Sequence, residues 1–364
     1  MKQKIVLHIG YGKTGSSAIQ SVLAKNHALL KSEGVLYAEH PSFAEASQGR
    51  ITSGNLDPEH WFEGQVIATA AREPGYRLYL FSNENIFHRM DEFVATASKY
   101  ADRYEFEIIL FVREPLERLN SAYQQAVKRR GFTGDIREVA EHDRDLPKAA
   151  SLLAELRQLN IAFKIFNYST TRRDTVKALL SHLSLWDLIA REGDADVGAV
   201  NRSLTAAEAN FILYVNQIFG AEYGALLSDA LVNQLPEVAA DPVPIDDGIK
   251  AYLRAKNMEA AEQLNRFLAP SDRLTLDMDA ASPPARWHEP LNPRQVDVIR
   301  KTFPSALTPA DGITLRDIAM KYERAEPLTR DDAVALMEYA QKARPHGQII
   351  AGKLNEWRKS GKSS

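Results

Sequence analysis

The stretch from residue 5 to residue 17, which reads Ile-Val-Leu-His-Ile-Gly-Tyr-Gly-Lys-Thr-Gly-Ser-Ser, constrains the fold more than any other part of the chain. An apolar run rich in β-branched residues ends at Gly10, three glycines fall within six positions, and a Thr/Ser cluster then opens a helical pattern. This order predicts a buried strand, a tight loop and the N-terminus of a helix. Such a loop turns successive backbone N–H groups toward one point, and the helix start adds a partial positive charge. We therefore expect an anion site that binds the phosphate end of a nucleotide.

The position of Lys13 separates this loop from the Walker A pattern. Walker A requires a glycine, four further residues and then Gly-Lys-Ser/Thr. Gly10 and Gly15 have that separation, but Ser16 follows Gly15 directly and the lysine lies two residues earlier. A lysine at this place reaches an anion from inside the loop. The alternative interpretation is an ordinary strand–turn–helix connection whose glycines serve only the backbone geometry.

A second motif follows the clearest later strand. Arg113 stands at the end of this strand, and Ser121 lies two turns into the next helix. A guanidinium and a hydroxyl so placed can hold one phosphate, the arginine through two parallel hydrogen bonds. The alternative is that Arg113 pairs with Glu114 or Glu117 and that Ser121 lies on a solvated face. Arg118 is expected to be a structural partner of an acidic neighbour.

Both motifs resemble those of the sulfotransferases. Residues 12 to 17 are similar to the family's 5′-phosphosulfate loop, residues 8 to 10 look like its bacterial branch, and Arg113 and Ser121 keep the eight-residue spacing of its 3′-phosphate motif. The resemblance covers about residues 4 to 280. It implies the donor 3′-phosphoadenosine 5′-phosphosulfate, transfer of its sulfuryl group to a hydroxyl or amine, the product adenosine 3′,5′-bisphosphate, and no metal. The residues that it assigns to the donor are Gly12, Lys13, Thr14, Gly15, Ser16, Ser17, Arg113 and Ser121, with Asn201 and Ser203 from a third segment.

That third segment reads Asn-Arg-Ser-Leu from residue 201 to residue 204. It is similar to an Asn-x-Ser-Leu element of bacterial sulfotransferases, and by resemblance it would help to close over the nucleotide. From the residues alone, Ser203 or Thr205 is the N-cap of a helix that begins near residue 206.

The in-line displacement that the resemblance implies builds negative charge on the bridging oxygen of the leaving phosphate. Lys13 and the N–H groups of residues 14 to 17 would stabilise that charge. The acceptor hydroxyl also needs a base close to the loop. Glu84 is the first choice, because it follows the strand ending at residues 81 and 82, and a similar Ser-x-Glu element is frequent in the bacterial family. The alternative is a carboxylate that pairs with a nearby arginine.

Residues 40 to 64 are polar and weakly periodic, and we expect them to border the acceptor. A carbohydrate or glycolipid fits the bacterial resemblance best, while a small metabolite or a peptide tyrosine stays open. His8, inside the first strand, is expected to be structural. The candidates for the acceptor side are His40, Asn55, His60, Trp61 and His88, and the three histidines are also alternatives to Glu84 as the base.

Strand-like and helical patterns alternate over the first two hundred residues, with strands expected at 5–9, 77–82, 107–112 and 161–166 and a short extended piece at 35–37. This predicts an α/β fold, a three-layer α/β/α arrangement with a mainly parallel sheet whose ligands bind beyond the carboxyl ends of the strands. One helix is expected from the loop to residue 33. From about residue 204 the pattern is nearly all helical, apart from a further strand at 273–278. The expected domains are residues 1–282 and a helical extension, residues 283–364, with a disordered tail.

Composition narrows the class of protein. Hydrophobic residues make up 45% and charged residues 26%, as in ordinary soluble proteins, and a net charge of −3 offers no bulk attraction to nucleic acid or an anionic membrane. The absence of cysteine excludes disulfides and thiolate-bound metals. The apolar run at 5–9 is too short for a signal peptide, and no window approaches the ~18 apolar residues of a membrane helix. We therefore expect a cytoplasmic protein.

Two other functions compete with sulfuryl transfer. A P-loop kinase of a small molecule would need Gly-Lys-Ser/Thr at the loop end and an aspartate after a buried strand to hold Mg²⁺. The relevant strands instead end in Ser-Asn-Glu (82–84) and Val-Arg-Glu (112–114). A nucleotide-sensing or scaffolding module could have kept the fold and lost catalysis, but the presence of Lys13, Arg113, Ser121 and Glu84 argues against this.

Overall fold

The computed structural model describes residues 2–41, 43–48, 54–195, 202–278, 287–306, 308–322 and 330–360. The chain divides into two compact units. Unit 1 comprises residues 1–123, 135–200 and 245–282, and unit 2 comprises residues 124–134, 201–244 and 283–364. One boundary thus falls at residues 282/283. Residues 201–244, assigned from the sequence to the α/β domain, group with the C-terminal helices.

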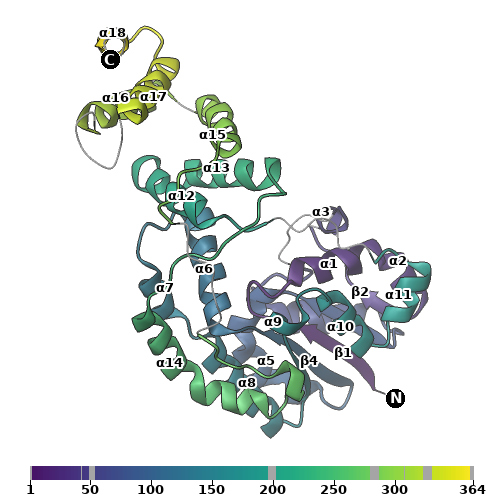
Figure 1. Cartoon of the computed structure of the whole chain (residues 1–364). Helices are drawn as coiled ribbons and strands as arrows, with labels where there is room; N and C mark the ends of the chain where they lie inside the picture. The colour runs from purple at the N-terminus through teal and green to yellow at the C-terminus, as the bar shows by residue number, and fades with distance from the viewer. Residues whose placement is uncertain are drawn as a thin grey trace. The chain divides into compact units, whose positions relative to one another are not determined.

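Unit 1 is built on a five-stranded sheet in which every neighbouring pair is parallel. The strand order is β2-β3-β1-β4-β5, so the strand that carries the glycine-rich loop is central (Figure 1). This confirms the predicted α/β fold with a parallel sheet. The strands are β1 Gln3–His8, β2 Val35–Tyr37, β3 Leu78–Ser82, β4 Tyr104–Val112 and β5 Ala162–Asn167.

Helices cover both faces of this sheet. The helices of unit 1 before β4 are α1 Ser16–Lys25, α2 His27–Ser32, α3 Phe43–Ser47, the π-helix η1 Phe62–Ile67, α4 Ala68–Arg72, the 3₁₀ helix η2 Glu84–Arg89, α5 Met90–Thr96 and η3 Ala97–Tyr100. Those after β4 are α6 Pro115–Arg130, which continues into unit 2, α7 Ile136–His142, α8 Asp145–Gln158, α9 Tyr168–Thr171, α10 Thr175–His182, α11 Trp186–Glu192, α14 Asp247–Asn265 and η4 Pro270–Asp272.

The alternation of side chains along the strands explains the two covered faces. On one face, Val6 and Ile109 pack in a buried cluster with residues of α1 and α10. On the other face, the Phe106 ring lies 5.6 Å from Phe62 of η1 and 5.4 Å from Phe93 of α5, measured between centroids. Two apolar layers therefore hold the sheet, and its carboxyl edge is left to the loops.

Two expected elements differ in the structure. The helix expected to run to residue 33 is broken at Asn26, whose amide donates to the carbonyls of Val22 and Asp194 and so ends α1 early. The strand expected at 273–278 is wrong. Its backbone N–H groups are taken by side chains, those of Thr275 and Leu276 by the Glu114 carboxylate, so they are not available to a sheet.

Unit 2 is helical in its described part. A capping box starts α12, in which the Thr205 hydroxyl accepts from the N–H of Glu208 and the Glu208 carboxylate accepts from the N–H of Thr205. Arg202 pairs with the fully buried Glu208 at 2.7 and 2.8 Å. The helices are α12 Ala206–Phe219, α13 Ala221–Gln234, α15 Pro293–Ala306, α16 Pro309–Tyr322, α17 Arg330–Ala343 and α18 Gln348–Ser360.

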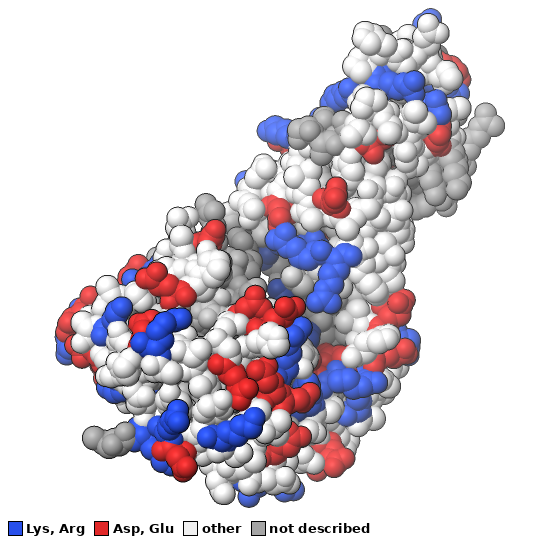
Figure 2. All heavy atoms as spheres, turned by 180° about the vertical axis from the view of Figure 1, so that it is seen from behind, with Lys and Arg blue, Asp and Glu red and all other residues white. Residues whose placement is uncertain are grey.

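The surface carries both signs of charge. Lysine and arginine side chains alternate with aspartate and glutamate over the face shown in Figure 2. Among the described helices, none is long and apolar enough to cross a membrane.

Candidate active site

The glycine-rich loop joins β1 to α1 and has the alternating backbone expected of an anion cradle. Lys13 and Gly15 have φ angles of +74° and +81°, whereas Gly12 and Thr14 do not have positive φ angles. Alternation of this kind turns successive N–H groups to one side. The Thr14 hydroxyl donates to the Tyr11 carbonyl at 2.8 Å and closes the loop on itself.

The glycines of the loop differ in what surrounds them. A Cβ at Gly10 would lie 2.8 Å from the Thr14 hydroxyl oxygen, and one at Gly15 only 3.0 Å from the Tyr168 ring, so both positions need glycine. A Cβ at Gly12 would meet no atom within 4 Å. The Ser16 hydroxyl, in the first turn of α1, is buried and lies beside the Glu84 carboxylate. Open space at Gly12 and a buried hydroxyl at the helix start fit a phosphate group.

Arg113 lies against this loop. Its Nη1 donates to the Lys13 carbonyl at 2.9 Å, and its Nε donates to Glu117 at 3.2 Å. The guanidinium carbon lies 5.1 Å from the centre of the Tyr168 ring. The ion pair of Arg113 with Glu117, the alternative interpretation of this motif, therefore exists, and it uses only the Nε hydrogen. Ser121, two turns into α6, lies one turn beyond Glu117 on the same side of the helix and is half-buried.

Glu84 reaches the loop from β3. It opens η2, which the Asn83 side chain caps by accepting from the N–H of Asn85 at 2.7 Å. Burial raises the pKa of Glu84 above its ordinary value, while Lys13, the Ser16 hydroxyl and Arg118 each offset part of that rise. The sheet thus places a carboxylate beside the loop lysine, as the sequence predicted from their common edge.

Arg118 is the structural arginine of the same motif. It forms a close ion pair with Asp145, to which its Nε donates at 2.9 Å, and both side chains are largely buried. His88 lies 3.7 Å from the other Asp145 oxygen, and its side chain is 56% exposed. Burial lowers the pKa of His88, which the Asp145 carboxylate partly offsets. The expectation for Arg118 is confirmed, and His88 stays an alternative base at the edge of the site.

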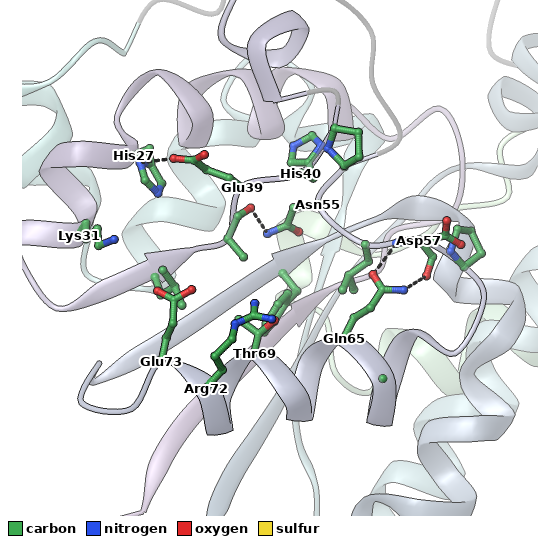
Figure 3. Close-up of a pocket in the computed structure, with 18 residues that line it drawn as sticks. His27, Lys31, Glu39, His40, Asn55, Asp57, Gln65, Thr69, Arg72 and Glu73 are labelled. Carbon is green, nitrogen blue, oxygen red and sulfur yellow. Dashed lines mark hydrogen bonds and ion pairs between the residues drawn. The ribbon is translucent and has the colours of Figure 1, made fainter.

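A pocket of about 740 Å³ holds two of the predicted acceptor residues, His40 and Asn55 (Figure 3). Leu36 and Phe81 belong to its lining, together with polar side chains of η1 and α4 such as Gln65. The Asn55 side chain is engaged by the fold, because it donates to the carbonyls of Ala38 and Leu80 and accepts from the N–H of Ser82. It shapes the pocket next to the strand end that leads to Glu84.

The other three predicted acceptor residues, His60, Trp61 and His88, are not among the residues that line this pocket. Trp61 is fully buried, lies nearly parallel to the Phe93 ring and donates from its indole to the carbonyl of Arg89, so its assignment to the acceptor site is wrong. Trp61 directly precedes η1, and this helix turns it into the core. His60 is exposed with a φ angle of +49° and is not among the residues that line the pocket.

His8 lies beneath the loop. Its Nδ1 is 2.8 Å from the Ser82 hydroxyl, and burial lowers its pKa to about 3. It is therefore a neutral packing group that joins β1 to β3, as expected from its place in the strand.

The third donor segment falls in unit 2. Asn201 lies outside the described residues, and Ser203 is exposed. Thr205 makes the N-cap, so the simpler interpretation of this segment holds for the residues that the structure describes.

Sequence reasoning missed two tyrosines of the site. Tyr168 packs against Gly15 and Arg113, and the Tyr11 hydroxyl accepts from the N–H of Arg113 at 2.7 Å. Tyr168 follows β5 at the same sheet edge as the other groups, which is the signal that could have identified it. Within the described ranges, no group of three or more His, Asp or Glu side chains could hold a metal ion.

No protein-family model and no curated protein matches this sequence. Among solved structures, the chain is similar to the crystal structure of a sulfotransferase from Alicyclobacillus acidocaldarius, with 12% sequence identity and a TM-score of 0.39. The match covers 73% of this chain and 96% of that chain.

Proposed function

We propose that this chain is a sulfotransferase that moves the sulfuryl group of 3′-phosphoadenosine 5′-phosphosulfate to a hydroxyl or amine of an acceptor. One observation carries the proposal: an anion cradle with an internal lysine has a half-buried carboxylate beside it at the same sheet edge. An anion site alone would suit many nucleotides. A base placed next to it suits transfer to a protonated acceptor.

The donor would supply a sulfuryl group joined to phosphate through a bridging oxygen. As the acceptor oxygen bonds to sulfur, the bond from sulfur to the bridging oxygen breaks, and its electron pair stays on the phosphate. Lys13, the loop N–H groups and the Ser16 hydroxyl are arranged to stabilise that charge. Arg113 and Ser121 would hold the 3′-phosphate.

Glu84 would accept the proton that the acceptor loses. Burial raises the pKa of Glu84 toward neutral pH, and a base transfers protons most effectively when its pKa lies near the working pH. Lys13 favours the ionised form that this role needs. After transfer, the proton passes from Glu84 to solvent.

The pocket that contains His40 and Asn55 is the proposed acceptor side. Its segment from residue 54 to residue 56 is bonded to the residues before Glu84, since Asn55 pairs with Ser82 and the Asn83 amide donates to the Leu56 carbonyl. Polar groups border it, and Figure 3 shows His27 paired with Glu39 at its rim. A hydroxyl-rich acceptor, a carbohydrate or glycolipid, fits such a lining.

Calorimetry with adenosine 3′,5′-bisphosphate tests the donor site. We expect the wild type to bind it and Arg113→Ala to bind it about 10- to 100-fold more weakly, the effect of losing a hydrogen-bonded charge. Preference for ATP with Mg²⁺ would overturn the proposal in favour of a kinase. Turnover of labelled donor with cell extracts as the acceptor source tests catalysis, and binding without turnover would favour the non-catalytic module.

A further inference from the structure

Lys13 has a backbone conformation that side chains with a Cβ rarely adopt. Its φ angle is +74°, in the left-handed region. Such a conformation is unfavourable for a lysine and persists only where its neighbours hold it. What holds Lys13 therefore decides how the loop presents its N–H groups and its ammonium to an anion.

Arg113 forms hydrogen bonds with the loop at two points. The side chain of Arg113 donates to the Lys13 carbonyl at 2.9 Å, and the backbone N–H of Arg113 donates to the Tyr11 hydroxyl at 2.7 Å. Thr14 is tied in turn to the Tyr11 carbonyl. Of these bonds, the one from the Arg113 side chain is made to Lys13 itself.

The Arg113 guanidinium is held in place and still has donors to offer. Glu117 takes the Nε hydrogen, the Lys13 carbonyl takes one from Nη1, and the Tyr168 ring lies beside the plane. A guanidinium has five N–H donors, and these two contacts use two of them. An anion bound to the same guanidinium and the Lys13 carbonyl would share one rigid planar group.

From this geometry we propose that Arg113 is a positioning residue for the phosphosulfate loop, and that its bond to the Lys13 carbonyl couples the 3′-phosphate site to the 5′ site. The inference rests on the proposed function and adds a specificity determinant to it. Arg113 then raises the affinity even of ligands that do not contact it. A donor with a 3′-phosphate fixes the guanidinium, and through it the loop, whereas a donor without one does not.

Ser121 provides the matched control. It belongs to the same predicted phosphate site, but in the described part of the chain no hydrogen bond joins its side chain to the loop. Its loss should weaken only ligands that carry a 3′-phosphate.

The test measures binding of adenosine 5′-phosphosulfate, which lacks the 3′-phosphate, by calorimetry with the full chain. Arg113→Ala should weaken it about 10-fold, whereas Ser121→Ala should leave it unchanged within about twofold. Both variants should weaken adenosine 3′,5′-bisphosphate. Equal behaviour of the two variants toward adenosine 5′-phosphosulfate would overturn the inference.

A second comparison isolates the strain at residue 13. Glycine adopts a φ angle of +74° freely and alanine does not, so Arg113→Ala should cost affinity for adenosine 5′-phosphosulfate in a Lys13→Ala background and almost none in a Lys13→Gly background. The same cost in both backgrounds would contradict the proposal. Should Arg113→Ala fail to fold, Arg113→Lys replaces it, because one ammonium cannot serve both the carbonyl and a phosphate with planar geometry.

Two binding results distinguish the proposed function from the proposed coupling. A wild type that binds no adenosine 3′,5′-bisphosphate removes the proposed function. A wild type that binds it, together with an Arg113→Ala variant that keeps full affinity for adenosine 5′-phosphosulfate, removes the coupling alone.

Discussion

Glu107, in the amino half of β4, and Glu84, beyond the carboxyl end of β3, are two carboxylates of one sheet whose pKa values move in opposite directions. Burial would raise the pKa of Glu107, but hydrogen bonds from Lys4 at 2.8 Å and His182 at 2.6 Å outweigh it, and the pKa is lowered. For Glu84, burial outweighs the attraction of Lys13 and Arg118, and the pKa is raised.

The opposite directions of the two pKa shifts distinguish a carboxylate with a structural role from one suited to proton exchange. Lys4 and His182 compensate the negative charge of Glu107 within the fold, so the ionised form of Glu107 stabilises the native state. Glu84 stays under a burial penalty next to a lysine, which is the condition of groups that exchange protons or meet a ligand. Each carboxylate has its own lysine, so matched substitutions can test the contrast.

Glu84→Gln should affect catalysis, whereas Glu107→Gln should affect stability. We expect Glu84→Gln to lower kcat about 10²- to 10⁴-fold, the usual contribution of a general base, with donor binding retained. Glu107→Gln should lower the free energy of unfolding by about 1–3 kcal/mol and leave the turnover of the folded protein unchanged. Labelled-donor assays and urea titrations measure the two effects. Similar losses of kcat in both variants would break the contrast.

The two lysines should divide in the same way. Lys13→Ala should lower kcat about 10²- to 10³-fold, because it removes a cation from the developing charge. Lys4→Ala should change turnover less than twofold and stability by about 1 kcal/mol or less, because the Lys4 side chain is 40% exposed. Donor turnover and thermal unfolding of both variants check this. The prediction fails if Lys4→Ala is the less active of the two.

Acidification should remove activity before it removes the contribution of Glu107 to stability. Glu84 acts as a base only when ionised, and its pKa is raised, so kcat/KM should fall as the pH drops through that raised value. The pKa of Glu107 is lowered on folding. Its stabilising effect is therefore fully present above about pH 4.3, the pKa of a glutamate in the unfolded chain, and it is lost as the pH falls through the lower pKa of the folded state. A pH profile of kcat/KM beside one of unfolding free energy, with Glu107→Gln for reference, tests the order.

The smallest expected effect is a gain in stability. Because the pKa of Glu84 is raised on folding, its ionised form costs folding free energy at any pH above the raised value. Glu84→Gln should therefore raise the unfolding temperature by roughly 1–2 °C while it lowers kcat. Calorimetric melting of the two proteins decides this, and a lower unfolding temperature would mean that the ionised carboxylate is a net structural contact.

The strands and the loop were predictable because their signals are local. The apolar run before Gly10 and the one before Arg113 are long enough to identify buried parallel strands, and the glycine spacing identifies the loop. The edge at which Lys13 and Glu84 meet follows from parallel topology alone.

The rest depends on contacts that no local pattern records. The bond from Arg113 to the Lys13 carbonyl joins residues 100 positions apart and depends on a side-chain conformation. Trp61 stands in a polar segment, and its burial depends on contacts with the distant residues Arg89 and Phe93. Residues 273–278 have the composition of a strand, but Glu114 binds the N–H groups that pairing would need.

The central place of β1 in the sheet also bears on how the chain folds. β1 precedes both of its neighbours in the sequence: His8 meets Ser82 across 74 residues, and the loop meets Arg113 across 100. Until β3 and β4 have formed, this apolar strand has two open edges, each a template for pairing with another chain. A nucleotide that spanned the loop and Arg113 would bind only the assembled sheet, so by mass action it would favour the native state over such misassembled forms. The donor would then serve the protein as a folding ligand as well as a substrate.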